Sequence, residues 1–127
     1  MRFRVLIVDD EPNIVTSLAF LMRESNYDVR IASNGEEALL LLETFRPNLL
    51  LLDVMLPQRS GFDVCREIRD KPSFAEVKIV MLTAKGRDLE RNEGLGMGAD
   101  AYVTKPFSTK ALMSTVRGLL QSTARSG

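Results

Sequence analysis

Five residues that could carry out chemistry each follow an apolar run of this chain. They are Asp9, Asp10, Asp53, Thr83 and Lys105. If the runs are parallel strands, these side chains meet at the carboxyl edge of one sheet, where open α/β sheets bind ligands. Three carboxylates, a hydroxyl and an ammonium group in one crevice suit a divalent cation and a phosphoryl group.

The chemistry of phosphoryl transfer explains why these groups would be gathered. Packed carboxylates repel one another, and Mg²⁺ relieves this by taking one or two of them with a carbonyl, waters and a phosphate oxygen. Transfer then needs in-line positioning and neutralisation of the charge on the three equatorial oxygens. The cation, the Lys105 ammonium and the Thr83 hydroxyl with nearby backbone N–H groups would cover these oxygens. Asp53, between them, is the natural nucleophile for an acyl phosphate.

Strand-like and helix-like segments alternate along the chain. Strands are predicted at 4–8, 28–32, 48–52, 77–82 and 101–104. Segments with apolar residues at helical spacing lie between and after these strands. The apolar stripes include Leu18 and Met22 in the first segment, Ala38 and Leu42 in the second, Phe62, Cys65 and Ile68 in the third, and Leu112 and Val116 in the last. A fourth helix before Gly98, weakened by Gly94 and Gly96, looks the softest. The pattern predicts a (βα)₅ fold.

The order of the strands can also be predicted. The first, third and fourth runs are continuously apolar, as expected of strands covered by helices on both faces. The second alternates and the fifth is short, which is typical of edges. Right-handed crossovers then give a five-stranded parallel sheet in the order 2-1-3-4-5, the doubly wound, flavodoxin-like α/β fold.

Three serines are expected to begin helices. Ser33 with Glu36 and Ser60 with Asp63 have the spacing of capping boxes, and Ser108 can cap the last helix.

Composition excludes several classes of protein. The 127 residues suit one domain at 1–121, followed by a polar tail or linker stub at 122–127. Lys plus Arg (17) equal Asp plus Glu (17), so no basic excess points to nucleic acid. No apolar stretch approaches a membrane span and no signal peptide is visible, and the single Cys65 fits a reducing compartment. We therefore expect a cytoplasmic protein that binds neither membrane nor nucleic acid directly.

The chain contains no histidine. This excludes Ser-His-Asp and Cys-His catalysis and histidine metal sites. It also means that any phosphohistidine donor must be a partner.

Four motifs carry a resemblance to a known family. They are residues 8–12 (VDDEP), 52–57 (LDVMLP) with Gly61, 82–84 (LTA) and 98–107 (GADAYVTKPF). Together they resemble the chemotaxis-regulator-like receiver domain of two-component response regulators, over about residues 4–121. Each motif alone is weak, but the combination is highly specific.

The resemblance implies a role for each site residue. Asp53 would be the phospho-acceptor, assisted by Thr83 and Lys105. Mg²⁺ would be held by Asp9, Asp10, Asp53 and the backbone carbonyl of Met55. Thr83 and Tyr102 would switch the surface formed by the fourth helix, fifth strand and fifth helix. The Lys105–Pro106 bond would be cis.

The same resemblance implies the partners. A sensor histidine kinase or histidine phosphotransfer protein would donate the phosphoryl group, and an output domain or downstream protein would receive the signal. The winged-helix regulators of this family dimerise through charged pairs. At the matching positions this chain has Ala101, Ala111 and Thr115, although Asp100 and Arg117 remain. We therefore expect a monomer or weak dimer.

Self-dephosphorylation is predicted to be slow. In the family, the residues two past the acceptor and two past the threonine border the path of the attacking water. Here they are Met55 and Lys85, and neither an apolar nor a protonated side chain can orient that water as a base.

Two rival functions remain open from the residues alone. A phosphatase of the haloacid dehalogenase type also uses aspartate, lysine, threonine and magnesium, but it carries Asp-x-Asp at the first strand, where this chain has adjacent Asp9-Asp10. A flavin-binding module would need a phosphate loop after the first strand, where Glu11 and the two aspartates would repel the flavin phosphate. We expect a switch rather than an enzyme.

Overall fold

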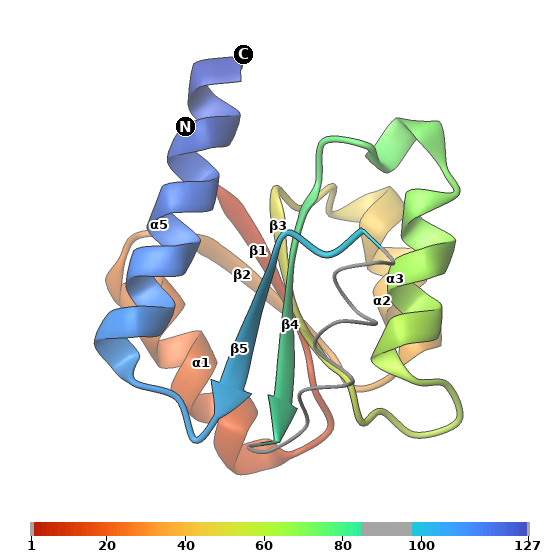
Figure 1. The fold of residues 1–127 in the computed structure, drawn as a ribbon, viewed down its shortest axis with the longest axis horizontal. Coiled ribbons are helices and arrows are strands. Elements are labelled where there is room, and N and C mark those ends of the chain that lie inside the picture. Colours follow the sequence, from red (N-terminus) through yellow and green to blue (C-terminus); the bar gives the residue numbers. More distant parts are fainter. Residues whose placement is uncertain (1, 85–97, 127) are drawn as a thin grey trace.

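The fold is organised around five parallel strands in the order β2-β1-β3-β4-β5 (Figure 1). A computed structural model describes residues 2–84 and 98–126. The strands are β1 (Arg4–Val8), β2 (Asp28–Ala32), β3 (Leu49–Asp53), β4 (Lys78–Ala84) and β5 (Ala101–Lys105). The helices are α1 (Pro12–Glu24), α2 (Gly35–Thr44), α3 (Gly61–Arg69), the short 3₁₀ helix η1 (Pro72–Phe74) and α5 (Thr109–Ser126). The predicted strand order is confirmed, whereas the expected fourth helix falls outside the described residues.

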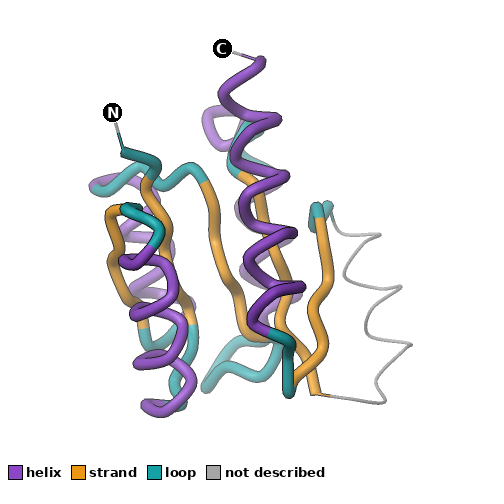
Figure 2. Tube along the Cα trace, turned by 90° about the vertical axis from the view of Figure 1, so that its left-hand side faces the viewer, coloured by secondary structure: helices purple, strands orange, loops and turns teal. Residues whose placement is uncertain are grey.

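The sheet separates two hydrophobic cores, because successive strand residues point to opposite faces. Leu6, Leu50 and Met81 pack with α2 and α3 on one face. Ile7 and Leu51 pack with α1 and α5 on the other. Figure 2 shows α1 and α5 lying in front of the strands on that second face. The continuous apolar runs are thus strands buried on both sides.

The two edge strands are those expected. Ile31 on β2 is partly exposed, and every described side chain of β5 is at least partly exposed. Cys65 lies on the inner face of α3 among buried apolar residues, and burial raises the pKa of its thiol.

The bounds of β1 and β2 match the predicted ranges, and those of β3, β4 and β5 differ from the predicted ones by one or two residues. Asp53 and Lys105 are the last residues of their strands, and Thr83 lies within β4. Helix α5 continues to Ser126 and extends beyond the sheet (Figure 1), where a polar tail was predicted from residue 122. No helix in the described part of the chain is both long and apolar enough to cross a membrane.

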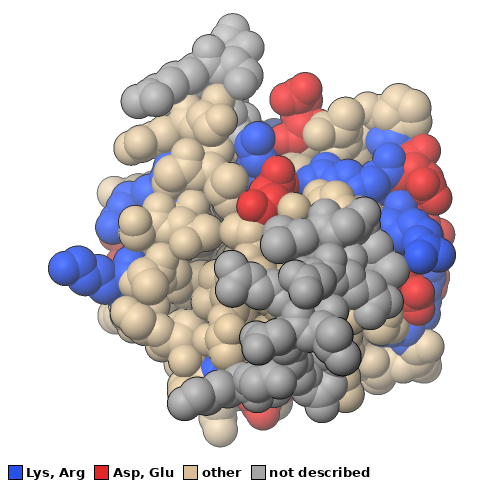
Figure 3. Space-filling view, viewed as in Figure 1, with Lys and Arg blue, Asp and Glu red and all other residues tan. Residues whose placement is uncertain are grey.

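Acidic and basic side chains alternate on the surface beside α3. Figure 3 shows Lys and Arg lying among Asp and Glu there, with no continuous basic patch among the described residues of that face. This arrangement matches the equal numbers of basic and acidic residues in the sequence.

Two of the three predicted helix caps are confirmed. Ser60 Oγ accepts a hydrogen bond from Asp63 N and Ser108 Oγ from Ala111 N, both at 3.2 Å.

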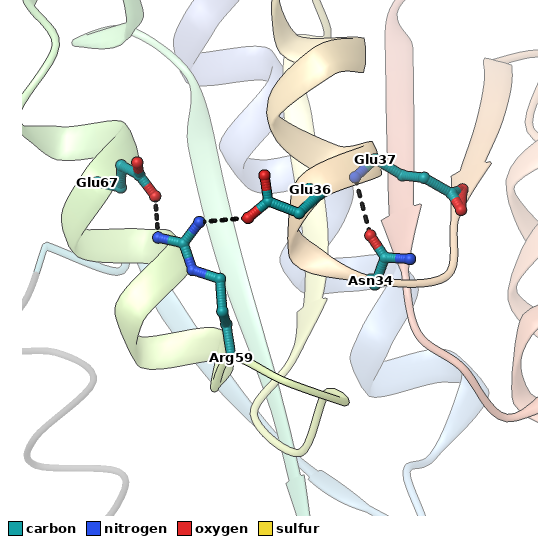
Figure 4. Close-up of polar contacts among 5 residues, drawn as sticks. All are labelled: Asn34, Glu36, Glu37, Arg59 and Glu67. Atoms are coloured by element: carbon teal, nitrogen blue, oxygen red, sulfur yellow. Dashed lines mark hydrogen bonds and ion pairs between the residues drawn. The ribbon is translucent and has the colours of Figure 1, made fainter.

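The third predicted cap, Ser33 with Glu36, is wrong by one residue. Asn34 begins α2, and its side chain accepts from Glu37 N at 2.9 Å (Figure 4). The backbone N–H of Ser33 in turn donates to the Glu37 carboxylate at 3.3 Å. Asparagine and serine are about equally good N-cap residues, so the adjacent Ser33 and Asn34 left the first residue of α2 ambiguous in the sequence.

Candidate functional site

Three carboxylates meet at the carboxyl edge of the sheet. One oxygen from each of Asp9, Asp10 and Asp53 lies within 4.8 Å of the others. Asp9 is 1% exposed and Asp53 is 5% exposed, whereas Asp10 faces solvent. Asp9 and Asp10 follow β1 and Asp53 ends β3, and these strands are hydrogen-bonded neighbours. The strands are parallel, and the order in which they are added reverses between β1 and β3, so both carboxyl ends border the acidic crevice that the sequence predicted.

Lys105 supplies the positive charge of this crevice. Its ammonium donates a 3.1 Å hydrogen bond to Asp9 Oδ2 and lies 3.4 Å from Asp53 Oδ1. Burial acts to lower the pKa of Lys105, but the charges of Asp53 and Asp9 outweigh it and leave the pKa raised. The next peptide bond, Lys105–Pro106, is cis.

Asp53 is held in a poor environment for a second negative charge. Burial, followed by the charge of Asp9, raises its pKa from 3.8 to about 6, although Lys105 and the Met55 N–H act in the opposite direction. A cation that joined the crevice would reverse this effect, because it favours the ionised carboxylates.

The loop after Asp53 folds back tightly on that residue. Met55 N donates to Asp53 Oδ1 at 3.2 Å, and Gly61 N donates to Val54 O at 2.8 Å. A Cβ atom at Gly61 would lie 2.2 Å from the Asp53 carbonyl oxygen, so only glycine fits there. Gly61, which the sequence motif includes, thus permits the close return of the chain into α3.

Thr83 lies on β4, the strand next to Asp53, and Tyr102 lies on β5, one strand further along the sheet. Thr83 is 3% exposed and directly follows Leu82, which is the register partner of Asp53. Tyr102 is half-buried on β5 and packs against the core that contains α2 and α3. The fold therefore places Thr83 at the same edge of the sheet as Asp53 and Tyr102 on the strand beside Thr83. Lys85 lies outside the described residues.

The donor set fits magnesium. Hard oxygen ligands from carboxylates are those Mg²⁺ takes, and the crevice carries three carboxylates against one ammonium group. Asp9, Asp10 and Asp53 would hold the ion. The neighbouring Lys105 would remain available for a phosphoryl oxygen.

Two features of the site surroundings were missed by sequence reasoning. A groove of about 570 Å³ between α1 and the β5–α5 connection is lined by Phe20, Leu21, Lys105 and Phe107 among others. Phe20 is 62% exposed there, although it looks like an ordinary helix residue in the sequence. Arg59 contacts the carboxylates of Glu36 on α2 and Glu67 on α3, and no sequence-spacing rule predicts these pairs.

Comparison with known proteins agrees with this geometry. Residues 5–117 match the family described as the response regulator receiver domain. The chain is 45% identical over 121 residues to the alkaline phosphatase synthesis transcriptional regulatory protein PhoP of Bacillus subtilis strain 168. That alignment covers 95% of this chain and 50% of PhoP, so the chain spans about half the length of this relative.

Solved receiver structures share the whole fold. A putative response regulator from Chloroflexus aurantiacus J-10-fl superposes with a TM-score of 0.92 at 35% identity, covering 95% of this chain and 99% of that one. The BeF3-activated DrrB receiver domain superposes with a TM-score of 0.86 at 31% identity, with the same coverage.

These relationships distinguish the candidate functions. Family membership favours a signalling switch over a phosphatase of the haloacid dehalogenase type or a flavin module, and aspartate phosphorylation and Mg²⁺ binding are general features of the family. With its acidic crevice, lysine and five-stranded sheet in the order 2-1-3-4-5, this chain belongs to the response regulator receiver domain family of two-component signalling.

Proposed function

We propose that Asp53 accepts the phosphoryl group, in a reaction that requires Mg²⁺ held by Asp9, Asp10, Asp53 and the Met55 carbonyl. The observation that carries this proposal is the position of the Lys105 ammonium, which lies between Asp9 and the buried Asp53. An Asp53 oxygen would attack phosphorus while the bond from phosphorus to the donor breaks. The product is an acyl phosphate, and the leaving group retains the bonding electrons.

The residues around Asp53 have complementary tasks. Bound magnesium would neutralise charge on one phosphoryl oxygen and orient it. Lys105 would contact a second oxygen, giving up part of its interaction with Asp53. The Thr83 hydroxyl would contact the third. The Met55 N–H, which donates to Asp53, holds the carboxylate in one orientation.

The test is phosphate uptake by the purified chain. Incubation with magnesium and acetyl phosphate should add one phosphate, seen by intact-mass spectrometry. Asp53→Asn should abolish the adduct, while Asp63→Asn, an exposed carboxylate on α3, should leave it unchanged. An adduct that survives Asp53→Asn would refute the assignment.

The donor in the cell would be a sensor histidine kinase or a histidine phosphotransfer protein, because this chain contains no histidine of its own. A helix of that donor would rest in the groove beside Phe20, which is continuous with Lys105 and Pro106 at the site. A phosphohistidine on such a helix could reach Asp53.

The phosphorylated site would signal through Thr83 and Tyr102. Movement of the Thr83 hydroxyl toward the phosphoryl group would open space for Tyr102 and alter the surface that includes β5, α5 and the segment before them. An output domain or a downstream protein would read this surface. Loss of the phosphoryl group would occur in the same site by attack of water.

A further inference from the structure

We propose that Arg59 is a positioning residue for phosphoryl uptake, because it fixes the loop at 54–60 that carries Met55 beside the acceptor. This inference rests on the proposed role of Asp53. Nothing in the sequence motif requires an arginine at this position.

Arg59 holds the loop to two helices at once. Its guanidinium contacts Glu36 on the first turn of α2 at 2.8 Å and Glu67 on α3 (Figure 4). The Figure shows the guanidinium between the two carboxylates, with one nitrogen directed at each. A planar fork can serve two acceptors in fixed directions, which a lysine cannot do.

The polar half of the loop is largely exposed, and in the described part of the chain it is anchored less firmly than the apolar half. Its first half is anchored by Val54 and Leu56, which pack into the core below. Pro57 and Gln58 are exposed, and Gln58 has the strained positive φ of 70°. Among the described residues, Arg59 is therefore a long-range tether between the apolar anchors and Gly61, where the loop closes on Val54.

The location of the tether links it to metal binding. The Glu36 end lies at the start of α2, which follows β2, and Ala32 at the end of β2 accepts a hydrogen bond from Asp9 N. Arg59 thus ties the loop of Met55 to the side of the sheet that carries Asp9. Placement of the Met55 carbonyl and N–H relative to the carboxylates depends on this connection.

Exposure separates positioning from general stabilisation. The side chains of Arg59, Glu36 and Glu67 are 31%, 67% and 39% exposed. Ion pairs this exposed add little to global stability. Their effect is local: they restrict the loop, and a loop placed wrongly by a fraction of an ångström weakens both metal binding and transfer.

The experiment compares Arg59→Gln and Glu67→Gln with Arg2→Gln. Arg2 forms an exposed ion pair with Asp28 at the start of β2, away from the carboxyl edge, and serves as the matched control. Three quantities are measured: the Mg²⁺ dissociation constant by NMR titration, hydrogen exchange of the Met55 and Leu51 amides, and the initial rate of phosphorylation by acetyl phosphate.

We expect Arg59→Gln to raise the Mg²⁺ dissociation constant by about 3- to 10-fold, less than the roughly 10- to 100-fold loss typical when a direct partner of a metal ligand is removed, because Arg59 acts through the loop. The Met55 amide should exchange faster while Leu51 in β3 is unchanged. Glu67→Gln should weaken Mg²⁺ binding less than Arg59→Gln does. The double variant should have nearly the same Mg²⁺ dissociation constant as Arg59→Gln alone. The Mg²⁺ affinity of Arg59→Lys should lie between those of the wild type and Arg59→Gln, since the lysine can keep one carboxylate partner.

Equal Mg²⁺ affinity and equal Met55 exchange in wild type and Arg59→Gln would overturn the proposal, as would the same loss in Arg2→Gln. Faster exchange at both Met55 and Leu51 would also overturn it, because that result indicates general destabilisation. The magnesium and exchange data are independent of phosphate uptake. A wild type that binds Mg²⁺ but takes no phosphate on Asp53 would instead refute the proposed function.

Discussion

The ammonium of Lys105 hydrogen-bonds to Asp9 at 3.1 Å, although the two residues are 96 positions apart and lie at the carboxyl ends of strands that are not neighbours in the sheet. Strands β3 and β4 lie between β1 and β5, so the lysine side chain reaches along the sheet edge past Asp53. One cation is therefore shared by the two most buried carboxylates of the site.

Lys105→Met should destabilise the metal-free protein because it leaves Asp9 and Asp53 without this counter-charge. We expect a loss of about 1–3 kcal/mol in the free energy of unfolding at neutral pH, below the cost for fully buried pairs. Urea unfolding with a chelator measures it, and Lys110→Met, an exposed lysine on α5, is the control. Equal losses in the two variants would contradict the shared-cation interpretation.

Asp53→Asn should make the metal-free protein more stable. The folded-state pKa of Asp53 is raised from 3.8 to about 6, so its ionisation opposes folding as pH rises through this range. Removing the charge should gain about 1–3 kcal/mol above pH 6 at about 1.4 kcal/mol per pKa unit. The gain should shrink as pH falls from 6 and disappear below about pH 4. The measurement is unfolding of both proteins in the presence of a chelator from pH 4 to 8. A gain in stability that stays constant across this range would exclude the ionisation of Asp53 as its cause.

The match between sequence and structure was closest where burial leaves few choices. Continuous apolar runs such as 49–52 fixed the central strands and, with the edge positions of β2 and β5, their order. Surface charges were not predictable in this way. Arg59 contacts residues 23 and 8 positions away, and any of many exposed acids could have been its partner. The end of β4 beyond Thr83 and the cap at Asn34 were missed by two residues and one residue, because the ends of strands and helices are the least sharply defined parts of these elements.

Phe20→Ala should slow phosphoryl transfer from a phosphohistidine donor while leaving transfer from acetyl phosphate unchanged. The small molecule needs no docking surface, whereas a donor helix would lose contact area in the groove beside Lys105. Losing a buried aromatic side chain should cost the donor reaction about 10-fold or more in kcat/KM. Leu40→Ala is the control, since Leu40 is 67% exposed on α2, across the sheet. An equal loss of rate with both donors would show that Phe20 supports the fold of the chain and is not part of a donor interface.

The phosphorylated form should be long-lived, lasting many minutes. Met55 is 59% exposed beside the acceptor, so its apolar side chain can cover the approach to phosphorus without orienting a water. Met55→Asn combined with Lys85→Glu should accelerate decay by about 10²-fold, as expected when a positioning group for water is gained. The measurement is loss of the phosphate adduct after the donor is removed. Decay of the wild type within seconds would rule this interpretation out.

The isolated chain should remain a monomer or a weak dimer when it carries beryllofluoride. Asp100 Oδ2 accepts hydrogen bonds of 2.8 Å from both Arg69 and the backbone N–H of Ile79, so this acid is already engaged within the chain. Ala101 and Thr115 offer no replacement charge. Sedimentation velocity with and without beryllofluoride tests this, and a tight symmetric dimer through the β5–α5 face would be inconsistent with it.

The division of the interior by the sheet has a consequence for sequence variation. Leu42 belongs to the core that contains α2 and α3, and Val116 belongs to the core that contains α1 and α5. Because the two side chains belong to separate clusters of the described residues, truncations at these positions should add in their effects on unfolding free energy. Each helical layer can therefore diverge almost independently of the other.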